Sequence, residues 1–239
     1  MLVRIASYNL RKCLGLDMRR RPDRTLQVIA ALGAQIVVLQ ESDRRLPPRP
    51  AALPPEMAAA EGWQIPDFGG PGGSMGWHGN AMLVRPGIGL LHSAHIELPG
   101  LEPRGAILAE FDTALGPLRV VGLHLGLVRR FRLLQLAAIR RQLDRLPPMP
   151  TVIAGDFNEW RGTSALRPAA GELHFAPTPP SFPAPRPVAR LDRIAHCGRI
   201  RVAAAGRLNA KPAQIASDHL PVWADLAPLP AADGPMAAA

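Results

Sequence analysis

The stretch Thr151–Trp160, TVIAGDFNEW, places two polar side chains directly after a short apolar run. Thr-Val-Ile-Ala is typical of a buried strand, and Gly155 then lets the chain turn. Asp156 and Asn158 follow at i and i+2, so both side chains point the same way if the backbone stays extended. This places a carboxylate beside a carboxamide at a strand end, where α/β proteins tend to carry their chemistry. Gly, Asp and Asn also form ordinary turns, and the stretch alone is equally consistent with a turn.

Other short apolar segments along the chain predict further strands, and amphipathic segments predict helices between them. The strands are expected at residues 3–8, 36–39, 80–85, 88–98, 105–111, 118–125, 190–195, 200–205 and 220–226. Helices are expected at residues 22–32, 56–61, 129–146 and 164–170, while the Pro-rich segments 45–55 and 177–187 must be irregular. No linker divides the chain, so residues 1–226 are expected to form one domain and residues 227–239 a disordered tail.

Several of the predicted strands stop at, or start from, a polar residue. These residues are Asn9, Glu41, His124, Asp156, Asn158, Asp192, Asp218 and His219. Considered alone, Glu41 could equally be a solvated loop carboxylate. A single histidine on a strand, such as His124, is more often a packed or surface residue than a ligand. Asp192 lies between apolar neighbours and needs a partner if it is buried.

The composition limits the classes of protein that this chain can belong to. With 47% hydrophobic residues among 239, the chain can bury a core, which excludes disorder throughout. A net charge of +9 favours anionic partners, although nearly all of the basic residues are Arg, which could also reflect a biased genome. Two cysteines are too few for a disulfide framework and are not spaced as a metal site. No apolar run is long enough to span a membrane and the N-terminus is not a signal peptide, so we expect a cytoplasmic protein.

The order and local sequence of these polar strand ends resemble the endonuclease/exonuclease/phosphatase superfamily. The segments that look like its successive motifs are SYNLR, LQES, GNAMLV, PRGAIL, GLHLG, GDFN, RLDRI and SDHLPV. They span nearly the whole chain. The resemblance implies a four-layer α/β sandwich of DNase I type, in which two packed mixed β-sheets are flanked by helices. It also implies two pseudo-symmetric halves, with IASYN and IAGDFN as matching strand ends.

The resemblance implies a site for Mg²⁺ or Mn²⁺. Glu41 is expected to be the main ligand, with Asn9 and Asp218 close by and water in the remaining positions. A carboxylate-poor, water-rich oxygen site suits these cations, whereas the chain lacks the dense His and Cys cluster of a zinc site.

The resemblance also implies roles for the other polar residues. Asp156 is expected to position and deprotonate the attacking water, and Asn158 to orient water and phosphate. His219 is expected to pair with Asp192 and to neutralise charge on the five-coordinate phosphorus, with a role as general base as the competing assignment. His124 would donate to a non-bridging oxygen.

Arg104, from PRGAIL, and Asn80, from GNAMLV, are expected to contact the substrate. Arg104 is otherwise an ordinary surface arginine. Selectivity is expected in residues 47–79 and 177–187, where no motif aligns, so the resemblance does not identify the substrate.

The sequence therefore predicts a Mg²⁺-dependent phosphoesterase, most simply a nuclease-like phosphodiesterase with nucleic acid as a candidate substrate. The alternative is a phosphatase or phosphodiesterase acting on a small or lipid-derived phosphate; few aromatic residues are available for stacking on bases. A remote alternative is a non-catalytic polyanion-binding protein, which the completeness of the polar set disfavours. No lipidation motif supports attachment to a membrane surface, and no protein partner can be inferred.

Overall fold

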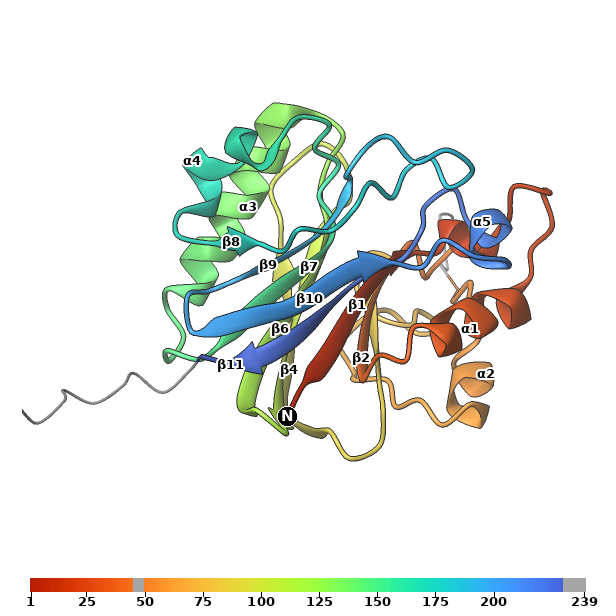
Figure 1. Ribbon diagram of the computed structural model, residues 1–239, viewed down its shortest axis with the longest axis horizontal. Helices are drawn as coiled ribbons and strands as arrows, with labels where there is room; N and C mark the ends of the chain where they lie inside the picture. The colour runs from red at the N-terminus through yellow and green to blue at the C-terminus, as the bar shows by residue number, and fades with distance from the viewer. Residues whose placement is uncertain (45–49, 230–239) are drawn as a thin grey trace, which may run out of the picture.

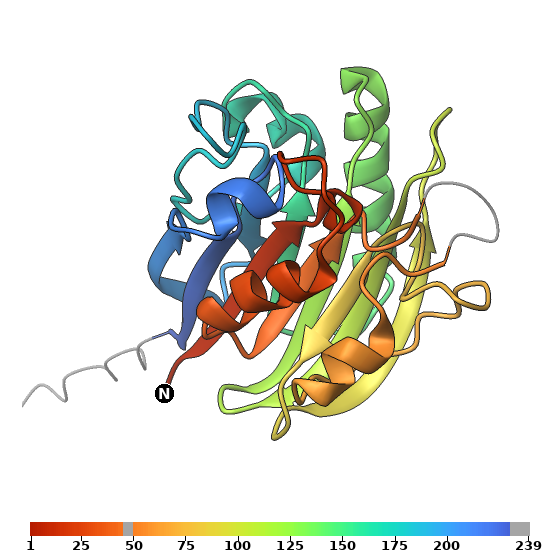
Figure 2. The same ribbon diagram turned by 90° about the vertical axis from the view of Figure 1, so that its right-hand side faces the viewer.

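The computed structural model describes residues 1–44 and 50–229. Two mixed β-sheets pack face to face, and helices cover the outer face of each, which confirms the predicted four-layer α/β sandwich (Figure 1, Figure 2). The first sheet has the order β10-β11-β1-β2-β3 and contains β1 (Val3–Asn9), β2 (Ile36–Gln40), β3 (Ala81–Val84), β10 (Ile200–Arg207) and β11 (Val222–Pro228). The second has the order β4-β5-β6-β7-β9-β8 and contains β4 (Gly89–Glu97), β5 (Gly105–Thr113), β6 (Gly116–His124), β7 (Thr151–Asp156), β8 (His174–Phe175) and β9 (Asp192–His196).

The helices form the two outer layers of the sandwich (Figure 1). On the side of the first sheet lie α1 (Pro22–Ala31), α2 (Pro55–Ala60) and α5 (Ala213–Ala216). On the side of the second sheet lie α3 (Arg129–Leu143) and α4 (Arg167–Ala170). Short 3₁₀ turns at Arg11–Cys13 and Thr163–Ala165 complete the helical segments. None of the helices in the described ranges is long and apolar enough to cross a membrane.

Alternation of side chains along the central strands separates three apolar layers. In β1, Ile5 faces the opposite sheet, whereas its neighbour Ala6 faces the helices. In β7, Val152 faces the opposite sheet and Ile153 faces α3 and α4. Because successive residues of a strand point to opposite faces, short uninterrupted apolar runs are buried on both sides.

Two parallel strand pairs bring the polar strand ends to one edge of the sandwich. β1 pairs with β2 so that Asn9 lies opposite Gln40, directly before Glu41. β6 pairs with β7 so that His124 lies opposite Asp156. Because parallel strands end on the same side, residues that are far apart in the chain meet there.

Several boundaries differ from the sequence prediction. Strand β11 extends to Pro228, so Ala227 and Pro228 pair with β10 instead of belonging to a tail; residues 230–239 lie outside the described residues, as do residues 45–49 of the predicted irregular segment 45–55. The two-residue strand β8 and the one-turn helix α5 were not predicted, because such short elements carry no periodicity. In α3, Leu134 is 44% exposed, although a leucine is typical of the buried face of an amphipathic helix.

Candidate active site

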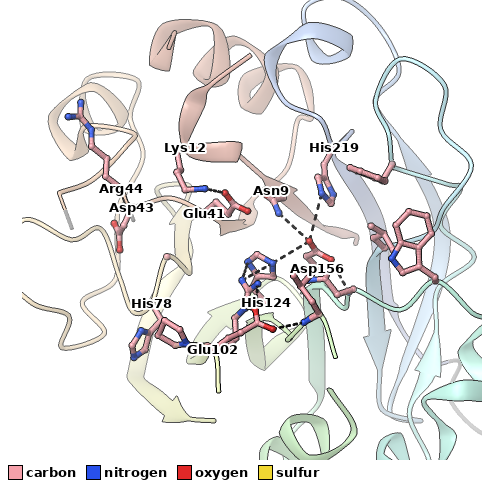
Figure 3. Close-up of a pocket in the computed structure, with 18 residues that line it drawn as sticks. Asn9, Lys12, Glu41, Asp43, Arg44, His78, Glu102, His124, Asp156 and His219 are labelled. Carbon is pink, nitrogen blue, oxygen red and sulfur yellow. Dashed lines mark hydrogen bonds and ion pairs between the residues drawn. The ribbon is translucent and has the colours of Figure 1, made fainter. Parts of the chain in front are cut away.

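A cavity of about 480 Å³ opens where the polar strand ends converge. Of the residues singled out in the sequence, it is lined by Asn9, Glu41, Arg104, His124, Asp156, Asn158 and His219. Figure 3 shows Asp156 at its centre, between Asn9, His124 and His219. The site is therefore assembled from both sheets.

The carboxylate of Asp156 is almost fully buried, and each of its oxygens has a different role. Oδ1 accepts a hydrogen bond of 2.9 Å from the backbone N–H of Asn158. Oδ2 accepts from Asn9 Nδ2 at 3.2 Å and lies 3.5 Å from His124 Nε2 and 3.8 Å from His219 Nε2. Three side chains from three segments thus surround one oxygen at the cavity floor.

Asn158 lies beside Asp156 by a different route from the one the sequence indicated. The backbone does not stay extended, since Asn158 adopts φ +50° and the Asp156 carboxylate closes a local turn onto its N–H. Asn158 Nδ2 donates to the carbonyl of Leu125 at 2.9 Å. The turn, not strand alternation, brings the two side chains into the same cavity.

His219 and Asp192 form a buried hydrogen-bonded pair. His219 Nδ1 lies 2.8 Å from Asp192 Oδ2, and Ser181 Oγ donates to the same oxygen. Burial opposes the charged imidazolium, but Asp192, assisted by Asp156 and Asp218, raises the pKa of His219 to about 10. The pair therefore directs a cationic Nε2–H toward the cavity.

Arg104 supplies the positive charge beside His124. Its Nη1 lies 3.0 Å from both ring nitrogens of His124, and Glu102 holds Nη2 at 2.8 Å. Burial lowers the pKa of His124 to about 4, although Asp156 opposes this shift. At neutral pH the imidazole is therefore uncharged, and the guanidinium carries the charge.

Glu41 stands directly after β2 with φ +52° and forms an ion pair with Lys12 (Figure 3). Burial alone would raise the pKa of this carboxyl. The pKa is instead lowered, because the positive charge of His124 when it is protonated, of Lys12 and of Arg104 favours the carboxylate. Glu41 is thus an anionic oxygen donor at the cavity wall.

The residues proposed for a metal offer oxygen donors of the kind that Mg²⁺ prefers. Ser217 ties the segment of Asp218 to β1, because its Oγ donates to the Asn9 carbonyl at 2.7 Å. Asp218 is half-buried, and its carboxylate lies 3.5 Å from Arg11 Nε. Carboxylate and carboxamide groups of Glu41, Asn9 and Asp218 therefore fit a hard divalent cation.

A second group of potential ligands is Asp156, Asp192 and His219, which have donor atoms within 4.8 Å of one another. This group could hold a cation. In this structure, however, His219 Nδ1 lies 2.8 Å from Asp192 Oδ2, so two of the three residues are already paired with each other.

Not every predicted site residue lines the cavity. Asn80 is fully buried behind it and donates to the carbonyls of Gly105, at 2.9 Å, and Trp77, at 3.2 Å. It thus holds the residue that follows Arg104. Asp192 lies behind His219, and Asp218 beside the cavity without lining it.

Other lining residues were not assigned to the site from the sequence. They are Lys12, Asp43, Arg44, His78, Gly79, Glu102, Pro103, Leu127, Trp160, Phe182 and Leu191. Proximity to a motif was the available signal for Lys12, three residues after Asn9, and for Trp160, two residues after Asn158. Phe182 lies in segment 177–187, where selectivity was expected but no single residue was named.

Comparison with known proteins agrees with this architecture. Residues 6–219 match the sequence model described as Endonuclease/Exonuclease/phosphatase family. The chain is 32% identical over 165 residues to the uncharacterized protein YbhP of Escherichia coli (strain K12), a match that spans 63% of each protein.

Solved structures share the fold over nearly the whole chain. An endonuclease/exonuclease/phosphatase from Bacteroides vulgatus superimposes with a TM-score of 0.76 and 20% identity, covering 95% of this chain and 99% of that one. A mannosyl-6-phosphatase from Bacteroides thetaiotaomicron superimposes with a TM-score of 0.74 and 20% identity, covering 94% and 99%. At these identities the similarity establishes the fold.

Proposed function

Because the chain belongs to the Endonuclease/Exonuclease/phosphatase family, whose members hydrolyse phosphate esters, we propose that it is a Mg²⁺-dependent phosphodiesterase that cleaves by in-line attack of water. The observation that carries this proposal is the convergence of Asn9, His124 and His219 on Asp156 Oδ2. A buried carboxylate oriented in this way can accept a proton from a water molecule in the cavity.

We assign each of these residues a separate role in the reaction. Asp156 takes the proton of the attacking water, and Asn158, held by the Leu125 carbonyl, orients that water. A divalent cation held by Glu41, Asn9 and Asp218 would polarise the phosphate and stabilise the leaving oxygen.

Two cationic groups would neutralise the phosphate. The imidazolium of His219, kept charged and oriented by Asp192, donates from Nε2 to a phosphate oxygen. Arg104, with the neutral His124 beside it, holds a second oxygen. Phosphoryl transfer depends mainly on such positioning and charge stabilisation.

A diester is favoured over a monoester because the cavity extends beyond Asp156 in more than one direction. Lys12 and Arg44 line one part of it (Figure 3), whereas Phe182 lines the part beside His219, with Trp160 next to Phe182, so a phosphate at Asp156 has room for two substituents. The net charge of +9 keeps nucleic acid among the candidates. A monoesterase activity is the second candidate, since a protein of the same fold is a mannosyl-6-phosphatase.

The experiment is hydrolysis of a substrate panel by the purified protein with Mg²⁺ or Mn²⁺, with and without EDTA. The panel holds plasmid DNA, RNA, bis-p-nitrophenyl phosphate and p-nitrophenyl phosphate. Asp156→Asn removes the proton acceptor, and Asp112→Asn, an exposed carboxylate at the far end of β5, is the matched control.

EDTA-sensitive cleavage that is lost in Asp156→Asn and kept in Asp112→Asn supports the proposal, and the preferred ester distinguishes diesterase from monoesterase. Failure to cleave any ester with either metal would contradict it.

A further inference from the structure

The cavity has two chemically different walls around one reaction centre. Figure 3 shows Lys12, Asp43 and Arg44 together at one side of the cavity, and His219 next to Asp156. The other wall is apolar: Phe182 packs against His219 and Trp160 against Phe182, and Leu191 and Leu127 also line the cavity. No catalytic step of the proposed mechanism uses these apolar side chains.

Aromatic rings form a continuous row from the floor of the cavity to its rim. The Phe182 ring lies 4.8 Å from the His219 imidazole, centroid to centroid. The Trp160 indole meets Phe182 edge to face at 5.8 Å. Trp160 is 63% exposed and Leu127 is 65% exposed. An indole and a leucine open to water beside a catalytic cavity are apolar surface that the fold itself does not cover.

Buried polar contacts hold the two loops that carry Leu127 and Trp160. Arg132 donates to the carbonyl of Leu127 at 2.5 Å and to Glu159, the residue before Trp160, at 3.1 Å. Arg193 donates to the carbonyls of Glu159 and Arg161, both at 2.9 Å. The loop backbones on both sides of Trp160 are therefore fixed, and the wall is formed before any ligand arrives.

We propose that the wall of Leu127, Trp160 and Phe182 is a subsite for an apolar substituent of the phosphodiester, and that this substituent is an alkyl or acyl chain. The inference rests on the proposed phosphodiesterase function and names its substrate class as an amphiphilic phosphodiester. The polar substituent lies toward Lys12 and Arg44, and the chain lies along the row of rings.

The character of the exposed side chains favours an aliphatic chain over a nucleic acid base. A single exposed indole lines the cavity together with Leu127. The loops that carry Leu127 and Phe182 hold two further exposed aliphatic side chains that do not line the cavity, Val128 at 54% and Val188 at 68%. Val188 belongs to the same loop as Phe182, because its N–H donates to the Phe182 carbonyl at 2.9 Å. Bases stack on successive aromatic faces, whereas branched aliphatic side chains pack well against methylene groups.

The test is a series of phosphodiesters of glycerol with butanol, hexanol or octanol, used as dissolved monomers and followed by phosphorus NMR. Glycerol is polar and cannot occupy the apolar wall, so only the alkyl chain varies. We expect kcat/KM to rise about twofold per CH₂, less than the roughly fourfold of a fully buried methylene, because the wall is open on one side.

The variants are Trp160→Ala and Leu127→Ser, with Leu90→Ser as the matched control. Leu90 is 48% exposed near the start of β4, and its neighbour Gly89 pairs with Asp112 at the strand end away from Arg104. In both wall variants kcat/KM should depend less on the length of the alkyl chain. In Leu90→Ser this dependence should be the same as in the wild type. Circular dichroism confirms that each variant is folded.

Binding of the octyl ester in EDTA, measured by calorimetry, separates this inference from the proposed function. Chain-dependent affinity that is lost in Trp160→Ala supports the subsite even if no ester is hydrolysed, in which case only the proposed activity fails. Hydrolysis without dependence on chain length, or a dependence that survives both wall variants, overturns the subsite. Preferred cleavage of an oligonucleotide over the octyl ester, unaffected by Trp160→Ala, also overturns it.

Discussion

Asp156 shows how much of this site depends on a single side chain. One oxygen closes the turn to Asn158, and the other is surrounded by Asn9, His124 and His219. The proton-accepting role and the local turn therefore belong to the same carboxylate, and a substitution can separate them.

We predict that Asp156→Asn lowers kcat by a factor on the order of 10²–10⁴, the usual contribution of a positioned general base. The amide can still accept the hydrogen bond of the Asn158 N–H, so the fold should be retained. Steady-state kinetics together with thermal unfolding measures both effects. Near-normal turnover in a folded variant would refute the assigned role.

The residue before Asp156 is constrained by a close backbone approach. Gly155 has φ +156°, and a Cβ at this position would lie 2.0 Å from the carbonyl oxygen of Leu123 in the neighbouring strand. Neither atom belongs to a flexible side chain, so the strand would have to move. Gly155 pairs within β7 and does not turn the chain, so the glycine of GDFN is required by sheet packing and not by the turn expected from the sequence.

Gly155→Ala is accordingly predicted to destabilise the protein by about 2–4 kcal/mol, since an overpacked core and a strained backbone both contribute. Gly116→Ala is the control, because Gly116 has φ +83° but no neighbour within 4 Å and should cost only roughly 1–2 kcal/mol of backbone strain. Chemical denaturation measures both. If both variants lose the same free energy of unfolding, the contact with Leu123 is unimportant.

Among the elements, α3 departs most from its sequence pattern. Arginines interleaved along an amphipathic helix are typical of a solvated face, yet Arg132 is 5% exposed and forms an ion pair with Glu159, which is 1% exposed. The pair joins the helix to the loop that follows β7. A buried ion pair of this kind fixes geometry more than it adds stability.

Glu159→Gln is predicted to lower the free energy of unfolding at neutral pH by about 1–3 kcal/mol, because Arg132 loses its charged partner. Burial opposes the carboxylate, but the Arg161 N–H and Arg132 lower its pKa in the folded state. The contribution of the carboxylate is therefore present above its unfolded pKa of about 4.3 and is lost as the pH falls through the folded pKa.

The difference between wild type and Glu159→Gln should accordingly shrink in acid, as measured by urea unfolding from neutral pH to about pH 3. Glu97→Gln, at an exposed position on β4, is the control and should change little. A difference that is independent of pH would contradict the role of the ion pair.

For the molecule as a whole, the net charge of +9 affects the encounter with an anionic substrate. Lys12, Arg44 and Arg104 line the cavity, so part of the positive potential lies at the site. Long-range attraction between exposed charges weakens as salt shortens the Debye length.

We predict that kcat/KM for an anionic diester falls several-fold between low salt and about 0.2 M salt. Arg44→Gln, at the mouth, should reduce the salt dependence more than Arg201→Gln, which is exposed on β10 at the edge of the first sheet. If both variants behave like wild type, the effect comes from the overall charge and not from the cavity.

The sequence by itself determined the main strands, the two long helices and the polar residues at the strand ends. Short-range patterns suffice for these features, because alternating or continuous apolar runs specify which faces are buried. The order of the motifs from SYNLR to SDHLPV also predicted the family, and the match over residues 6–219 confirms that prediction.

Only the tertiary structure decided which of these residues meet. Asn9 and Asp156 are 147 residues apart in the chain and share a hydrogen bond, while Asn80 lies behind the cavity and Phe182 lines it. Such contacts depend on how two sheets pack and on loops without periodicity, so no local pattern encodes them. The buried Arg132–Glu159 pair and the apolar wall beside His219 belong to the same class of long-range contacts.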